Sequence, residues 1–204
     1  MVKRGVIAGT IFCLLTIGCV STDLKAFRDP DFAGKKYQRI LVQAGFSDLN
    51  MREAAETAFV ERINKHAAVG IPSLSVFMPT RNYTADELGK IFTDQRIDAM
   101  MFVILTDAYT SQSYIPGGST TTGQATQSGN TINYSAQTQN YGGHYVSKPR
   151  AKYEIQLFDI PSGKKAWIAT SHSRGNAFAD FGNMITSLAD SVVDQLQHDG
   201  LLKK

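Results

Sequence analysis

The sequence predicts a single α/β domain with a mixed sheet of about five strands and three helices, in the order β-α-β-α-β, a long polar loop, β-β and α. Three observations predict this architecture. Short apolar runs alternate with helical patterns in the first half, which is typical of βαβ units. A hairpin pattern and a final amphipathic helix follow in the second half. Because two βαβ crossovers connect the first three strands, we expect these strands to be parallel and each crossover to be right-handed.

Three strands are predicted in the first half. Residues 37–44 centre on Ile40-Leu41-Val42 and end at Gly45. Residues 74–78 form a short apolar segment between two prolines. Residues 99–105 are apolar without interruption, which suits a central strand covered by helices on both faces.

Two helices are predicted between these strands. Asn50, followed three residues later by Glu53, starts a helical pattern that continues to about His66. Thr84 and Glu87 have the spacing of a capping box, in which each side chain bonds the backbone amide of the other residue. They therefore mark the start of the second helix.

The C-terminal part combines a hairpin and a helix. Residues 153–158 alternate in polarity, and a turn at 161–164 brings the chain back as a second strand, 165–174. Residues 181–196 have apolar side chains at helical spacing, with Asp180 as the expected N-cap.

The N-terminus has the layout of a bacterial secretion signal. Lys3 and Arg4 precede an apolar run of about thirteen residues, too short to span a bilayer, which takes about twenty. Gly18 then stands directly before Cys19. Residues 15–19 resemble the lipobox of bacterial lipoproteins, in which the cysteine receives a diacylglyceryl group and fatty acids such as palmitate. This resemblance implies that Cys19 is lipidated and is the first mature residue.

The lipobox resemblance also predicts how the chain is organised. Residues 1–18 are expected to form the signal peptide, 19–35 the lipidated N-terminus and a tether, and 36–204 a periplasmic α/β domain. Each buried methylene of a lipid adds about 0.8 kcal/mol, so several acyl chains hold firmly. Val20, where an Asp would imply retention at the inner membrane, favours the outer membrane. The domain is therefore expected to be anchored there, on the periplasmic or the surface face.

Charge and cysteine usage narrow the class of protein. The chain has 21 Lys and Arg against 18 Asp and Glu. Without Lys3 and Arg4 the balance is 19 to 18, which does not indicate a nucleic-acid partner. The two cysteines are Cys13, in the signal, and Cys19. The mature domain is thus expected to have no disulfide and to depend on its core for stability.

Residues 108–147 form an uncharged insertion that carries five of the eight tyrosines. Such a long connection is unusual in a compact domain. It can be a flexible polar loop or a protruding hairpin, a surface for a partner, or a membrane-inserting hairpin of an oligomeric pore. In the second reading, tyrosines act as amphipathic anchors. The predicted contact residues are Tyr114, Tyr134, Tyr141 and Tyr145.

No catalytic, cofactor-binding or metal site is predicted. The four histidines are scattered, whereas a zinc site needs convergent ligands. The sequence contains neither a nucleophile elbow nor a phosphate-binding loop. Asp98, Asp107 and Asp159 stand at strand ends, where capping or turn formation is expected rather than acid–base chemistry. The chain is therefore predicted not to be an enzyme.

The order of the elements, and the hairpin motif Leu157-Phe-Asp-x-x-Ser-Gly-Lys-x-x-Trp167, resemble bacterial envelope lipoproteins with an anticodon-binding-like α/β domain. This group includes the curli-secretion lipoprotein, the lipoprotein activators of penicillin-binding proteins and uncharacterised families. The resemblance covers residues 36–202. It implies a non-catalytic scaffold, secretion factor or activator that contacts envelope proteins or other copies of itself. The alternatives are a ligand- or glycan-binding module that uses the insertion, and a subunit of an oligomeric secretion pore.

Overall fold

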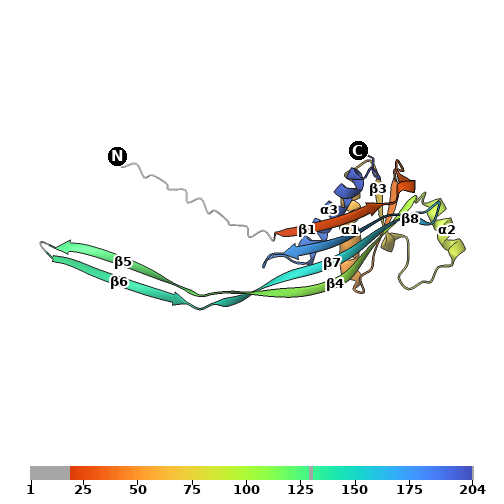
Figure 1. Ribbon diagram of the computed structural model, residues 1–204. Helices are drawn as coiled ribbons and strands as arrows, with labels where there is room; N and C mark the ends of the chain where they lie inside the picture. Colours follow the sequence, from red (N-terminus) through yellow and green to blue (C-terminus); the bar gives the residue numbers. More distant parts are fainter. Residues whose placement is uncertain (1–18, 129–130, 204) are drawn as a thin grey trace, which may run out of the picture.

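The structure, a computed structural model, describes residues 19–128 and 131–203; the predicted signal peptide lies outside this part. The described residues form a mixed α/β domain with a six-stranded sheet, a separate two-stranded sheet and three α-helices (Figure 1). The mixed class and the three helices are confirmed, whereas the expected number of about five strands is wrong. The helices are α1 (Leu49–Ile63), α2 (Ala85–Asp94) and α3 (Phe181–His198).

The main sheet has the strand order β1-β8-β7-β4-β2-β3. Its parallel part is as predicted, because β2 pairs in parallel with both β3 and β4. The predicted hairpin is also confirmed as the antiparallel pair β7–β8. The strands of this sheet are β1 (Val20–Arg28), β2 (Arg39–Ala44), β3 (Val69–Pro72), β4 (Ala99–Ile115), β7 (His144–Asp159) and β8 (Lys164–Gly175). The second sheet consists of β5 (Gly118–Ser128) and β6 (Thr131–Tyr141).

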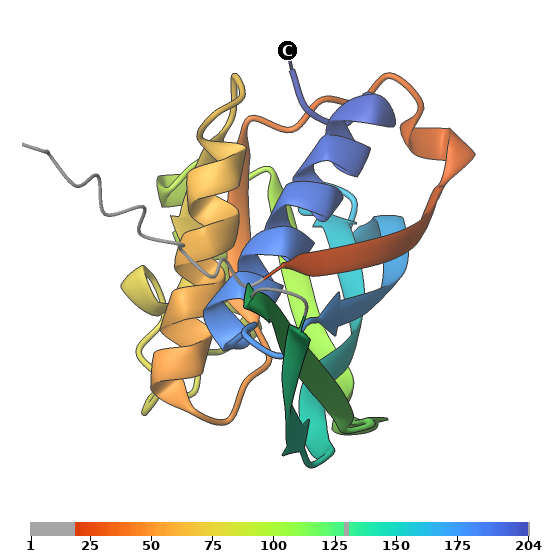
Figure 2. The same ribbon diagram turned by 90° about the vertical axis from the view of Figure 1, so that its left-hand side faces the viewer.

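The core has two layers. Helices α1 and α3 lie side by side over one face of the main sheet (Figure 2) and enclose the larger cluster. Helix α2 packs Phe92 against a smaller cluster on the opposite face. The two faces of β4 pack into different clusters. Met101 and Val103 belong to the larger cluster, and Met100 belongs to the smaller one. The predicted central strand between helices is therefore confirmed, and each buried side chain of this size contributes about 1.5–3 kcal/mol.

The second parallel strand lies at Val69–Pro72, not at the predicted residues 74–78. Because β3 is an edge strand, Pro72 can end it without leaving a ladder hydrogen bond unmade. The next residues, Ser73–Ser75, form a 3₁₀ turn. The buried Ser73 hydroxyl donates to Glu56 of α1 (2.6 Å), which holds this turn against the domain.

The predicted tether, residues 19–35, is instead part of the domain. β1 pairs antiparallel with β8 along its whole length and forms one edge of the sheet. Its inward side chains, Leu24 and Ala26 among them, pack against the core, and the Thr22 hydroxyl lies 3.0 Å from that of Ser187 in α3. The alternation of outward and inward residues is the signal in the sequence that the tether reading overlooks.

The helix starts follow local capping. Asp48, not the predicted Asn50, caps α1, because its carboxylate accepts a hydrogen bond (2.8 Å) from the amide three residues on. The predicted capping box at Thr84 and Glu87 is present, as is the predicted cap at Asp180. These caps satisfy amides that have no partner within the helix.

Candidate partner-binding hairpin

The uncharged insertion is a long hairpin that continues two strands of the main sheet. β4 and β7 stay paired as far as Ile115 and His144. β5 and β6 then pair with each other along their whole length. The hairpin projects far from the body of the domain (Figure 1). The predicted long polar loop is therefore wrong, because the polar strands satisfy their backbone groups by pairing, and the protruding-hairpin reading is confirmed.

The hairpin leaves the sheet at the end where β1 begins. At this end the strand pairing runs from Ser21 to Arg174, from Arg174 to Arg150, and from Arg150 to Tyr109. Cys19 is exposed and lies two residues before Ser21. Cys19 and the root of the hairpin therefore share one end of the sheet. Lipidation of Cys19 stays a prediction.

Along the two strands that lead into the hairpin, the last charged side chains lie at nearly the level of Cys19. Asp107 and Lys152 form an exposed ion pair (3.0 Å), and the hydrogen bond that Lys152 donates to Asp107 raises the pKa of this lysine. Lys148 lies opposite Ser111. Beyond it, from Ser111 to Ser147, the sequence contains no Asp, Glu, Lys or Arg. The part of the hairpin beyond the level of Cys19 is thus free of these charges.

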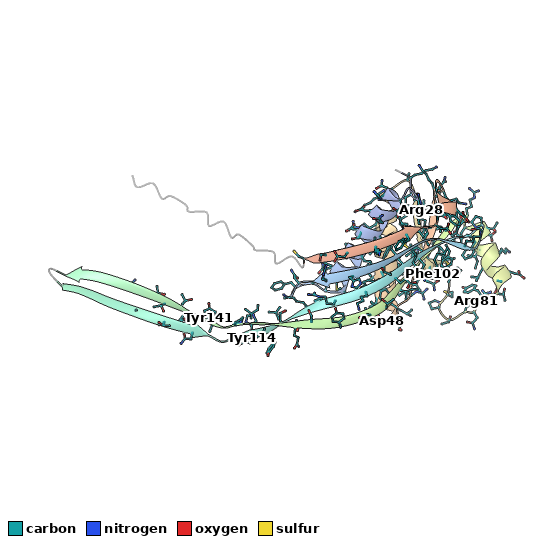
Figure 3. All side chains as sticks on the ribbon, in the orientation of Figure 1. Arg28, Asp48, Arg81, Phe102, Tyr114 and Tyr141 are labelled. Atoms are coloured by element: carbon teal, nitrogen blue, oxygen red, sulfur yellow. The ribbon has the colours of Figure 1, made fainter. Side chains whose placement is uncertain are left out.

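Three of the four predicted contact tyrosines lie where β4 and β7 pass into β5 and β6. Figure 3 labels two of them, Tyr114 and Tyr141. Tyr114 and Tyr145 are cross-strand partners, and their ring centroids are 5.1 Å apart. Tyr114, Tyr141 and Tyr145 are 55%, 60% and 71% exposed. Tyr134 belongs to β6 nearer the tip, and its side chain lies outside the described residues. We name the first three the tyrosine cluster.

Glycines make room for the tyrosine cluster. A Cβ atom on Gly118 would lie 2.7 Å from the Tyr141 hydroxyl. A Cβ atom on Gly143 would collide with the Tyr114 ring. The absence of a side chain at both positions therefore lets a tyrosine lie closer to the backbone than a residue with a Cβ atom would allow.

β5 and β6 form an uninterrupted polar ribbon. Their pairing contains no register shift, and in the described part of the chain each strand pairs only with the other. Residues 118–124 and 135–141 carry mainly Thr, Gln, Ser and Asn side chains, and the hydroxyls of Thr121 and Thr138 lie 2.9 Å apart. The ribbon offers hydroxyl and amide groups and two free backbone edges, but no charge.

An apolar groove of about 280 Å³ lies beside the root of the hairpin. Tyr109 and Tyr153 line its strand side, and Phe181 and Met184 of α3 line its helix side. Burial raises the pKa of Tyr153 to about 12, so its hydroxyl is neutral at physiological pH. The groove brings no nucleophile and base together and is suited to apolar contact.

A second groove, of about 540 Å³, lies between α2 and the opposite face of the sheet. Its aromatic lining includes Phe77, Tyr83 and Phe102, and Figure 3 marks Phe102 and Arg81. The Arg81 guanidinium lies 5.1 Å from the centre of the Tyr83 ring and pairs with Glu87. The charge of Arg81 is therefore already paired within the chain.

The three carboxylates predicted at strand ends all have partners within the chain. Asp98 accepts hydrogen bonds from the backbone amides of Gln38 (2.8 Å) and Arg39 (3.0 Å), and Asp159 accepts from Ser162 in the hairpin turn. The turn role predicted for Asp159 is confirmed. The predicted role of Asp98 is wrong, because Asp98 is neither a helix cap nor a turn residue and instead joins the start of β2 to the start of β4. Asp107 lies inside β4 rather than at a strand end and forms the ion pair described above. Within residues 19–128 and 131–203, no three His, Cys, Asp or Glu side chains converge as metal ligands would.

Glu56 carries a buried charge that the sequence pattern does not reveal. Glu56 of α1 is fully buried, and its carboxylate accepts from the Arg52 guanidinium (2.9 Å), the Ser73 hydroxyl and the Leu74 amide (2.9 Å). These donors satisfy the charge, so Glu56 is a structural link between α1 and the turn after β3. Its position four residues after Arg52 is the only local signal for this pair.

Comparison with known proteins gives likeness of fold alone. No protein-family model and no curated protein matches the chain. It is similar to the PelC dodecamer from Paraburkholderia phytofirmans, at 14% identity over 86% of this chain and 97% of that chain, with a TM-score of 0.49. It is also similar to the lipoprotein GNA1162 from Neisseria meningitidis, at 17% identity over 79% and 99% of the two chains, with a TM-score of 0.43. The resemblance to the curli-secretion and activator lipoproteins stays a prediction.

Across the described residues, no helix is both long and apolar enough to cross a membrane.

Proposed function

We propose that this chain is a non-enzymatic, lipid-anchored protein of the bacterial envelope that works through protein contacts made by its hairpin. The observation that carries this proposal is the uncharged hairpin itself, which projects from a well-packed domain and bears the tyrosine cluster near its root. The domain is the support, and the hairpin is the surface that reaches other proteins.

The energetics of the hairpin support a partner. A two-stranded ribbon is marginally stable by itself in water. Among the described residues, β5 and β6 contribute none to either core cluster, so packing against the domain does not stabilise these strands. The ring pair of Tyr114 and Tyr145 lies open to solvent, and aromatic side chains of this kind are frequent energetic centres of protein interfaces.

The position of Cys19 supports anchoring close to the domain. Because β1 starts at Val20, a lipid on Cys19 would hold the end of the sheet directly at the membrane, without a spacer. The root of the hairpin lies at the same end. Anchoring in the outer membrane, favoured by Val20, belongs to this proposal.

A deletion tests the proposed function. The variant replaces residues 111–147 by Asn-Gly, so that Asn, Gly and Lys148 form a short loop between Thr110 and Pro149, which already lie opposite each other. We expect it to fold, with an unfolding free energy within about 0.5 kcal/mol of wild type, because no core residue is removed. Cross-linked envelopes should yield specific partners with the wild-type chain and lose them with the deletion. Recovery of the same partners with both chains would contradict the proposal.

One observation favours a second candidate function, a subunit of an oligomeric secretion pore. The charge-free part of the hairpin begins at nearly the level of Cys19, and membranes exclude charged side chains. Against it stand the Thr and Gln side chains on both faces of the described ribbon. Ion conductance in planar bilayers that disappears with the 111–147 deletion would support the pore, and its absence would leave the contact function alone.

A further inference from the structure

We propose that the hairpin pairs edge to edge with the hairpin of a second copy of this chain, β5 of one copy lying against β6 of the next. This inference rests on the proposed function, because it names the partner of the surface assigned there. The occupant is another polar strand, and the contact is made by backbone hydrogen bonds.

The two edges of the hairpin are open to such pairing. Proteins usually protect an edge strand with Lys, Pro, a bulge or a covering element. β5 and β6 contain neither Lys nor Pro, their register is unbroken, and the described part of the chain places nothing against them. By contrast β1, at one edge of the main sheet, carries Asp23, Lys25 and Arg28, and β3, at the other edge, has only four residues and ends at Pro72. The unprotected edges are therefore confined to the hairpin.

The absence of charge points to a copy of the same chain. When identical surfaces meet, every charge lies near a like charge, which is destabilising across strands. A neutral ribbon avoids this repulsion, whereas a different protein could be recognised by complementary charge. Both strands carry Thr and Gln side chains. Because each of these side chains can donate and accept hydrogen bonds, it can bond to an identical side chain of another copy.

The geometry sets the orientation of the pair. Copies anchored through Cys19 in one membrane would point in the same direction, because the anchor and the hairpin root share one end of the sheet. β5 runs away from the domain and β6 returns, so a β5 edge beside a β6 edge is antiparallel. Equal anchor heights place Thr121 of one copy level with Thr138 of the next. Attachment to a common surface also raises the effective concentration of the hairpins.

Disulfide trapping tests the pairing in the full-length chain in its own membrane. Thr121→Cys and Thr138→Cys are made in separate, differently tagged copies, because the two positions already neighbour each other within one chain. Ala136→Cys and Asn140→Cys, on the same face of β6, cover a stagger of one pair in either direction. Paired strands bring cysteine Cα atoms to about 5 Å, whereas two β5 strands would lie about 10 Å apart, beyond the reach of a disulfide at about 7 Å.

We expect mixed expression to give about tenfold more disulfide-linked dimer than Thr121→Cys alone, since only the mixed pair lies within bonding distance. Thr121→Cys with Lys164→Cys, at the start of β8 and far from the hairpin, is the matched control and should give none. An added Thr122→Lys should abolish the mixed dimer by placing a charge on the edge strand.

Two outcomes would overturn the inference. Mixed dimers no more abundant than β5–β5 dimers would contradict the orientation. No dimer, with hairpin cysteines shielded by lipid from a membrane-impermeant maleimide, would show that lipid occupies the edges instead. In either case, the proposed function would stand if other proteins were still recovered in a hairpin-dependent way. If neither mixed dimers nor hairpin-dependent partners were found, the proposed function would be wrong as well.

Discussion

Single charged residues connect the irregular segments of this chain to its sheet. Asp159, at the end of β7, is only 2% exposed, accepts a hydrogen bond from the Ser162 hydroxyl (2.6 Å) and pairs with Lys35 (2.9 Å). Burial acts to raise the pKa of Asp159, but the hydrogen bonds from Ser162 and Lys35 outweigh it and hold the pKa below its ordinary value of 3.8. The carboxylate is therefore stabilised in its charged form.

This lowered pKa predicts how stability depends on pH. Because the folded state binds the proton less readily than the unfolded state, the stabilisation is present above about pH 4 and is lost as the pH falls through the folded pKa. We expect the unfolding free energy of wild type to fall more steeply between neutral pH and about pH 3 than that of Asp159→Asn. Urea unfolding at both pH values measures it, and equal losses would contradict the role of Asp159.

Removal of the buried carboxylate of Glu56 should be costly. Glu56→Ala leaves the Arg52 guanidinium and the Ser73 hydroxyl without their acceptor, so we expect a loss of about 3–5 kcal/mol in unfolding free energy. Glu53→Ala, on the exposed side of the same helix, should change it by less than about 0.5 kcal/mol. Equal effects in chemical unfolding would show that the buried network does not stabilise α1.

Residue roles could be predicted from the sequence where the partner is local. Thr84 and Asp180 were identifiable because a cap bonds an amide three residues away. Glu56 was not, because two of its donors come from the turn after β3, and the helical pattern does not specify which residue meets that turn. Tyr114 and Tyr145 were identified by composition, but their ring contact depends on a strand register that spans the whole insertion.

Among the elements, β1 shows what an edge strand adds to the domain. Leu24 faces α3 and packs against the core, whereas Lys25 points to solvent. If β1 belongs to the fold, Leu24→Ala should lower the unfolding free energy by about 1–2 kcal/mol, and Lys25→Ala should leave it within about 0.5 kcal/mol. Thermal or urea unfolding of both variants measures this. No loss for Leu24→Ala would restore the reading of residues 19–35 as a tether.

Elements with their own apolar pattern were predictable, and polar elements were not. β7 and β8 could be recognised from alternation and a four-residue turn, and β4 from its apolar run. β5 and β6 lack apolar alternation in the described ribbon, so only their pairing partners reveal them as strands. The strand predicted at 74–78 lies a few residues too late in the sequence, because Pro72 was expected to interrupt a strand but is tolerated at the sheet edge formed by β3.

At the scale of the whole molecule, Cys19 and the root of the hairpin lie at the same end of the sheet. Cys19→Ser removes the predicted lipid attachment without touching the core, since Cys19 is exposed. We expect the variant to be released from the membrane fraction while keeping the unfolding free energy of the wild-type domain, because acyl chains supply the membrane affinity. Unchanged membrane fractionation, or an unlipidated mature N-terminus in mass spectra, would remove the anchor from the account.

The most direct measurement places a photoreactive phenylalanine analogue at Tyr145, on the hairpin, and separately at Phe27, at the exposed edge of the sheet away from the hairpin root. Both side chains are open to solvent, at 71% and 61%, so access alone does not distinguish them. After irradiation of intact cells, we predict discrete protein adducts from position 145 and none from position 27. The absence of adducts at position 145, or the same adducts at both, would contradict the assignment of the hairpin as the contact surface.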